Sequence, residues 1–124
     1  MKVNIIKLSV AALGFPGGAT TSEIIGTQHD TSGPYTAGRG NQLGLKLCPP
    51  EVGPEYRLKY KDQPLHEKLY VAMKPIAGSD GEPHIFVLTH NAEGLCLDAA
   101  LARPDTEWYP EDKFMFCMSQ TAAP

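Results

Sequence analysis

Short stretches in which every second residue is apolar fill the chain after residue 41, and they constrain its fold more than any other feature. This alternation places the apolar side chains on one face of a β-strand. The run 84–89 (HIFVLT) is apolar on both faces, as in a strand that is buried on both sides. The stretches that we expect to form strands are 43–47, 56–60, 69–73, 84–89, 95–99 and 114–117.

Turn-forming residues separate these stretches. The 124 residues include 12 glycines and 11 prolines, which is more than a helical bundle can carry. Short strands that are regularly interrupted by such residues are typical of a sandwich or a small barrel. The sequence therefore predicts an all-β fold, a single small sandwich with about six or seven short strands.

The amino terminus has two interpretations. Lys2, an apolar stretch and small residues near Ala19 are typical of a secretory signal. The alternation of Ile6, Leu8 and Val10 with polar residues instead indicates a strand, which could lie at a sheet edge. The expected organisation is a signal segment or edge strand over 1–22, a Gly-rich loop or linker over 23–41 and the β-sandwich over 42–124.

The net charge and the absence of certain motifs argue against several classes of function. The formal net charge of −3 argues against a nucleic-acid binder, which needs a basic face. No apolar run reaches the ~18 residues of a membrane-spanning helix. Because no paired carboxylates, catalytic triad or phosphate-binding loop can be placed in a defined context, we expect no enzyme. The expected partners are a protein, a small ligand or a metal ion.

Three motifs occur in a suggestive order: 43–50 (LGLKLCPP), 56–65 (YRLKYKDQPL) and 87–97 (VLTHNAEGLCL). Together they resemble the pattern of the DUF4198 proteins, a bacterial periplasmic family similar to accessory subunits of nickel and cobalt uptake. Gly94 would supply the positive φ that closes the later hairpin. The resemblance implies a prealbumin- or immunoglobulin-like sandwich, a periplasmic or extracellular location and an accessory role in divalent-metal uptake.

The segment 105–112 carries four carboxylates around the only tryptophan. Such a loop could attract a cation, and its aromatic rings could stack on a sugar or anchor a protein contact. The alternative is a solvated loop whose tryptophan plugs one end of the sandwich. The candidate binding residues are Asp105, Glu107, Trp108, Tyr109, Glu111 and Asp112.

The three cysteines form no closely spaced metal motif. Cys96 and Cys117 alternate with leucines and phenylalanines expected to face inward, so both thiols would point to the opposite face. Neighbouring strands could then bring them within disulfide reach in an exported protein. The alternative is three unpaired thiols that are buried as small apolar groups. Cys48 is left without a partner in either case.

The four histidines neither establish nor exclude a metal site. His84 and His90 share a face of one strand, but about 20 Å separates them at ~3.3 Å per residue, so they cannot bind one ion together. His66 could approach either from another strand, and His29 lies in the Gly-rich segment. Surface or turn histidines are the simpler interpretation. A divalent metal ion remains the one candidate cofactor.

Two functions follow from the sequence. The first is an exported, non-catalytic β-sandwich binding module, with metal uptake as the role that the resemblance implies. The second is a structural subunit that polymerises or docks by β-strand addition, through its N-terminal strand, residues 2–10, or through a bare sheet edge. This second function would make the protein a homo-oligomer joined through an edge strand.

Overall fold

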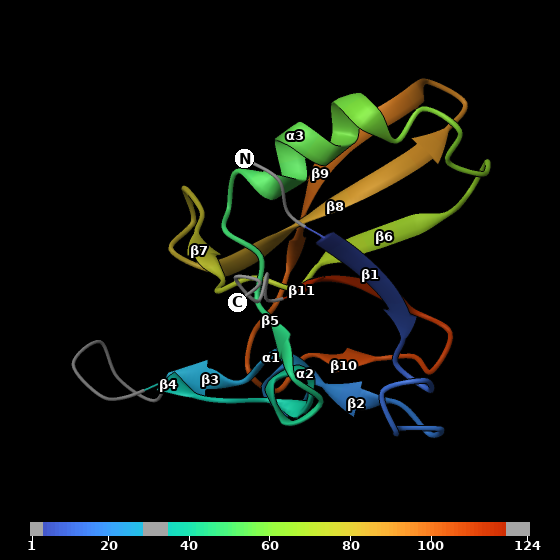
Figure 1. Ribbon diagram of the computed structural model, residues 1–124. Coiled ribbons are helices and arrows are strands. Elements are labelled where there is room, and N and C mark those ends of the chain that lie inside the picture. The colour runs from blue at the N-terminus through green and yellow to red at the C-terminus, as the bar shows by residue number, and fades with distance from the viewer. Residues whose placement is uncertain (1–3, 29–34, 119–124) are drawn as a thin grey trace, which may run out of the picture.

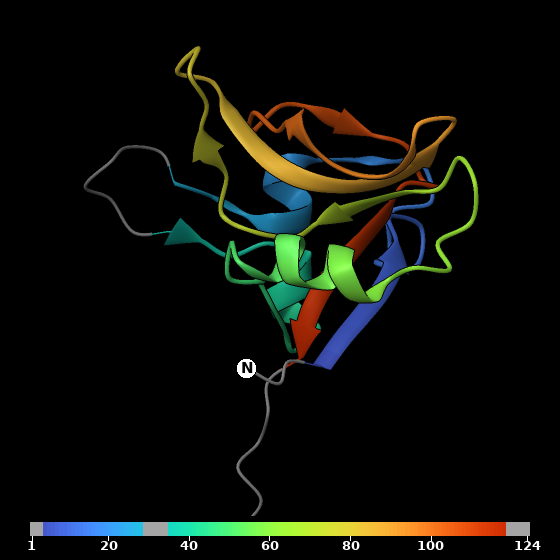
Figure 2. The same ribbon diagram turned by 90° about the horizontal axis from the view of Figure 1, so that it is seen from above.

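A curved seven-stranded mixed sheet organises residues 4–28 and 35–118, which the computed structural model describes (Figures 1 and 2). Its strands in this part of the chain are β1 (Asn4–Ser9), β5 (Leu45–Lys46), β6 (Lys68–Val71), β7 (Ile76–Ala77), β8 (Pro83–Asn91), β9 (Gly94–Leu101) and β11 (Lys113–Met118). The neighbours run β1-β11-β6-β8-β7, with β5 also paired to β11 and β9 also paired to β8. The pairing of β11 with β6 is parallel and the other pairings are antiparallel.

Smaller elements cover both faces of this sheet (Figure 2). Helix α3 (Val52–Lys59) lies on one face. The other face packs against the pair β2 (Ala19–Thr20) and β10 (Glu107–Trp108), with the helices α1 (Thr21–Ile25) and α2 (Arg39–Gln42) beside it. Strands β3 (Thr27–Gln28) and β4 (Tyr35–Thr36) form a separate pair. The protein is thus a small, sandwich-like all-β fold, as the sequence predicts.

The sheet buries apolar side chains on both faces, which explains the apolar character of strand β8. Tyr70 and Phe114 pack against Trp108 on the face away from α3. Leu69 and Leu88 are neighbours across β6 and β8, and both are fully buried on the opposite face. The prediction that 84–89 forms a strand buried on both sides is confirmed.

One predicted strand is wrong. The stretch 56–60 forms the end of helix α3 and its C-cap, Tyr60, while the other five stretches overlap β5, β6, β8, β9 and β11. The first turn of a helix tolerates a proline such as Pro54. A negative charge near the start of the helix (Glu55) and a positive charge near its end (Lys59) also interact favourably with the helix dipole. In the helix, Tyr56 and Tyr60 are one turn apart and their ring centroids lie 5.3 Å from each other, whereas Leu58 points to the opposite side and is 74% exposed.

The amino-terminal part of the described chain belongs to the same packed unit. Strand β1 pairs with β11 along six residues and ends the sheet, so the edge-strand interpretation agrees with the structure. The expected linker 23–41 instead holds α1 and α2, and its Ile24 and Ile25 are buried in the core. Thr20 caps α1 in a capping box with Glu23, which fixes its start. A signal function for 1–22 stays a prediction.

Gly18 offers a first test of this fold. Its φ is +95°, and a Cβ there would lie 2.6 Å from the backbone oxygen of Trp108. Gly18→Ala is therefore expected to destabilise the protein by about 2 kcal/mol in urea denaturation. Gly17→Ala is the matched control, because a Cβ at Gly17 meets nothing within 4 Å. Equal stability of the two variants would contradict this local geometry.

Candidate functional site

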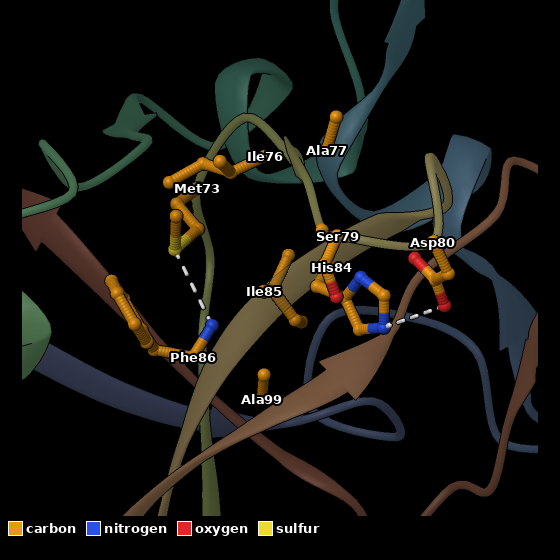
Figure 3. Close-up of a pocket in the computed structure, with 10 residues that line it drawn as sticks. Met73, Ile76, Ala77, Ser79, Asp80, His84, Ile85, Phe86 and Ala99 are labelled. Carbon is orange, nitrogen blue, oxygen red and sulfur yellow. Dashed lines mark hydrogen bonds and ion pairs between the residues drawn. The ribbon is translucent and has the colours of Figure 1, made fainter.

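An apolar pocket of about 350 Å³ opens between the β7–β8 hairpin and the sheet (Figure 3). Met73 and Ile85 are almost fully buried in its wall, whereas Ile76 is 44% exposed at its mouth. The amide of Phe86 lies 3.5 Å from the sulfur of Met73, which ties the two walls together. The apolar lining consists of Met73, Ile76, Ala77, Ile85, Phe86 and Ala99.

A polar rim borders this apolar pocket. Nδ1 of His84 carries the proton and donates to the carbonyl oxygen of Glu82 at 2.8 Å, since that oxygen can only accept. Nε2 of His84 lies 4.0 Å from a carboxylate oxygen of Asp80 (Figure 3). Arg103 donates to the Glu82 carboxylate at 2.8 Å, and this hydrogen bond lowers the pKa of Glu82. The rim therefore carries the Asp80 carboxylate beside His84, in addition to the Glu82–Arg103 ion pair.

The hairpin turn positions this rim. The amide of Gly78 donates to the carbonyl oxygen of Glu82 at 2.8 Å, and the amide of Glu82 donates to Oδ1 of Asp80 at 2.9 Å. The sequence GSDGEP supplies the small and polar residues that such a turn needs. A rigid turn thus holds Asp80 beside the mouth of the pocket.

Strand β9 lies at the edge of the sheet beyond β8 (Figure 1), and its Ala99 lines the apolar pocket. The amide of Ala102 donates to the carbonyl oxygen of Pro83 at 2.9 Å, which fixes the hydrogen-bonded pairs of the β8–β9 ladder. Every second residue of β9 therefore directs its backbone N–H and C=O away from β8. Within the described residues these groups have no hydrogen-bond partner. We call this set the β9 edge: Leu95, Leu97, Ala99 and Leu101.

The β9 edge lacks the usual protection against strand pairing. Its side chains are apolar, with Leu95 and Leu101 each 39% exposed, and β9 contains neither lysine nor proline. Asp98 points to the other face of the sheet, where its carboxylate accepts a hydrogen bond from Thr89. Ala99 belongs both to this edge and to the lining of the apolar pocket. The edge and the pocket are thus one continuous surface.

The opposite edge of the sheet, β1, is better protected. The amide of Val10 donates to the carbonyl oxygen of Asp112 at 2.8 Å, so the backbone groups of Ile5, Lys7 and Ser9 face outward. The carbonyl oxygen of Ser9 already accepts from the amide of Leu13. An edge lysine such as Lys7 discourages the approach of another strand.

The acidic segment is not assembled as a single binding site. Trp108 is only 7% exposed, and its indole N–H donates to the Thr21 hydroxyl at 2.8 Å. Its ring packs edge-on against Tyr70 and Phe114 at centroid distances of 4.7 and 5.1 Å. Trp108 therefore plugs the core, and the prediction that its ring stacks on a ligand is wrong.

The other members of that segment lie at the surface. Tyr109 is 70% exposed, and Asp112 accepts its amide proton at 2.8 Å. Glu107 and Tyr109 border a hollow of about 290 Å³ together with Glu23. Burial and the nearby Asp112 raise the pKa of Tyr70. Asp105 and Glu111 are exposed, and ligand binding by this segment stays a prediction.

The predicted pairing of Cys96 with Cys117 is wrong. Strands β6 and β8 lie between β9 and β11, so these two cysteines are not on neighbouring strands. Cys117 instead lies beside Cys48, with 2.8 Å between the two sulfurs. Both of these thiols are buried, whereas Cys96 is half-buried.

The histidines gather no metal site in the described chain. The amide of His66 donates to the carbonyl oxygen of His90, and both side chains border a polar cleft of about 510 Å³. His84 belongs to the rim of the apolar pocket, and His29 lies outside the described residues. Across 4–28 and 35–118, no three His, Cys, Asp or Glu side chains come together as a metal ion requires. A divalent metal cofactor stays a prediction.

Comparison with protein-family models, curated proteins and solved structures found no match for this chain. Among the described helices, none has the length and apolar character needed to cross a membrane. The site therefore has to be interpreted from its own geometry.

Sequence reasoning missed the apolar pocket and the β9 edge. The stretch GLCLDAAL was correctly predicted to be a strand, and its lack of lysine and proline is a signal that can be read from the sequence. Its edge position, however, depends on the order of the strands, which the alternation of residues does not encode. The pocket is lined by residues that are far apart in the sequence, such as Met73 and Ala99, and only the folded sheet brings them together.

Proposed function

We propose that this protein is a non-catalytic binding module that takes an extended segment of a partner protein as an added strand along the β9 edge. The observation that carries the proposal is the open, apolar β9 edge lying beside the apolar pocket. Export and an accessory role in metal uptake stay predictions, and the proposal needs neither of them.

Backbone hydrogen bonds would supply much of the affinity. Each of the four residues of the β9 edge offers one N–H and one C=O group, and these project away from β8. In strand addition such main-chain bonds hold the peptide regardless of its sequence, and each contributes about 1 kcal/mol. The edge is as long as a typical strand, so the added segment can be held along its whole length.

The apolar pocket would supply the selectivity. Ala99 has no side chain beyond its Cβ, so it leaves the way from the edge to Phe86 and Met73 unobstructed. A long apolar side chain of the added strand, placed opposite Ala99, can lean across it into the pocket. Side-chain pockets along a bound strand are the usual source of specificity in this mode of recognition.

Charge favours a basic partner. From residue 80 to the end of the chain, eight acidic residues stand against two basic ones. Asp98 is exposed near the middle of β9 on the face away from the pocket, and Asp80 lies at the pocket rim. Opposite charges on neighbouring strands attract. The preferred occupant is therefore an extended segment with apolar residues on one face and basic residues on the other.

The test uses a synthetic peptide of alternating valine and lysine, long enough to cover the β9 edge. On binding, the amides of Leu95, Leu97, Ala99 and Leu101 are expected to become protected from hydrogen exchange. A peptide with glutamate in place of lysine is expected to bind at least tenfold more weakly. Protection of the Ile5 and Lys7 amides instead would place docking at β1 and overturn the proposal, as would the absence of binding.

A pair of proline variants locates the docking edge independently. Ala99→Pro removes an outward N–H and leaves the β8–β9 ladder intact, so it is expected to weaken peptide binding at least tenfold. Lys7→Pro makes the same change at the β1 edge and should leave binding unchanged. Circular dichroism checks that both variants fold. If only Lys7→Pro weakens binding, the N-terminal strand is the docking element.

A further inference from the structure

The buried thiols of Cys48 and Cys117 lie side by side where β5 pairs with β11. The sulfur of Cys117 lies 2.8 Å from the sulfur of Cys48, although 69 residues separate them in the chain. Cys117 is on β11, and Cys48 follows β5, which pairs with β11. The amide of Cys48 donates to the carbonyl oxygen of Ala72 at 2.7 Å and fixes the backbone beside the thiol.

We propose that Cys48 and Cys117 form an intramolecular disulfide bond under oxidising conditions. The sulfurs need to approach by only ~0.8 Å to reach the bonding distance of about 2.05 Å. With a low-molecular-weight disulfide such as oxidised glutathione as the oxidant, the two protein thiols become one disulfide. The oxidant is reduced to two thiols, which take up both protons and both electrons.

The surroundings of the pair determine when the bond forms. Both cysteines are at most 4% exposed, so a disulfide reagent cannot reach them in the closed structure. Burial raises the pKa of both thiols, which lowers the fraction of the reactive thiolate. Oxidation therefore takes place during folding or through local opening of the segment around Cys48, rather than at the surface of the folded protein.

Cys96 is excluded from this reaction by its position. It lies on β9, with β8 and β6 between it and β11. The accessible thiol and the reactive pair are therefore different groups. This makes Cys96 an internal control, because oxidation of the pair leaves it free.

The direct test is a thiol map of the full chain equilibrated with oxidised and reduced glutathione. Trypsin cleavage after Lys46, Arg57 and Lys113 places the three cysteines in three different peptides. The expected result is a cross-linked peptide joining Cys48 to Cys117, with Cys96 outside the cross-link, either alkylated or carrying glutathione as a mixed disulfide. Three alkylated thiols, or a cross-link that contains Cys96, would overturn the proposal.

The bond should also change stability. A cross-link that closes a loop of 69 residues is expected to raise the midpoint of thermal unfolding by about 10 °C under oxidising conditions. Cys96→Ala should keep this shift, whereas Cys48→Ala and Cys117→Ala should lose it. A shift that survives either of the last two changes would assign the stabilisation to something other than this disulfide. The thiol map needs no variant and decides the question even if one variant fails to fold.

Discussion

Replacing Trp108 by alanine is expected to lower the free energy of unfolding by about 4 kcal/mol. The indole is almost fully buried and packs edge-on against Tyr70 and Phe114, so its removal leaves a cavity between the sheet and the β2–β10 pair. The change also leaves the Thr21 hydroxyl without its donor. Cavity formation and lost aromatic contacts act in the same direction.

Urea denaturation followed by circular dichroism measures this loss. Tyr109→Ala is the matched control, because the neighbouring tyrosine is 70% exposed and its removal should change stability little. Thr21→Val keeps the shape of the side chain but removes the acceptor of the indole N–H, so it is expected to cost about 1–2 kcal/mol. If Trp108→Ala were as stable as Tyr109→Ala, the tryptophan would not be the plug of this core.

The β content of this fold can be predicted from residue alternation because large apolar side chains recur at every second position of most of the longer strands. Phe114 and Phe116 alternate with Met115 in β11, and Leu69 and Val71 alternate with Tyr70 in β6. In β11 all three are buried, because the sheet is covered on both faces. The alternation thus locates five of the six expected strands correctly, although it does not tell which face of the sheet is covered or by which element.

Helix α3 shows where this reasoning stops. The alternation over 56–60 fits a strand, yet Leu58 is 74% exposed in the helix, and only Val52 and Gly53 are buried among the members of α3. Packing against β8, where a Cβ at Gly53 would come within 3.0 Å of Phe86, decides the outcome. Such long-range packing is not present in a local pattern of residues.

The order of the strands limits what can be said about the site. Strands β6 and β8 lie between β11 and β9, whereas β5 pairs with β11, so Cys117 lies beside Cys48 instead of Cys96. The same order leaves β9 at an edge. The neighbour of Cys117 and the open edge at β9 therefore depend on the strand order, which alternation cannot supply, whereas the acidic segment was conspicuous only because of its composition.

Arg57→Met is expected to destabilise the protein by about 3 kcal/mol, a large effect for a residue on a short helix. Nη1 of Arg57 donates to Oε1 of Gln63 at 2.7 Å and to the carbonyl oxygens of Thr89 and Cys96 at 3.2 and 3.1 Å. Nη2 donates to the carbonyl oxygen of Tyr60 at 2.5 Å. Methionine keeps the apolar stem and removes every one of these donors, so part-buried acceptors are left unsatisfied.

Lys59→Met is the matched control, since Lys59 is exposed on the same helix and its replacement should leave stability nearly unchanged. Gln63→Leu completes a double-mutant cycle: if the guanidinium and the amide act as one network, the double variant should lose less stability than the sum of the two single variants. Strictly additive losses of stability would show that the two side chains act separately.

Because Arg57 ties α3 to the carbonyl oxygen of Cys96, its loss should also speed hydrogen exchange at the amide of Cys96, which faces β8. The integrity of the β9 edge, and with it the proposed docking of a peptide, would then depend on a side chain of α3 that belongs neither to the edge nor to the lining of the pocket.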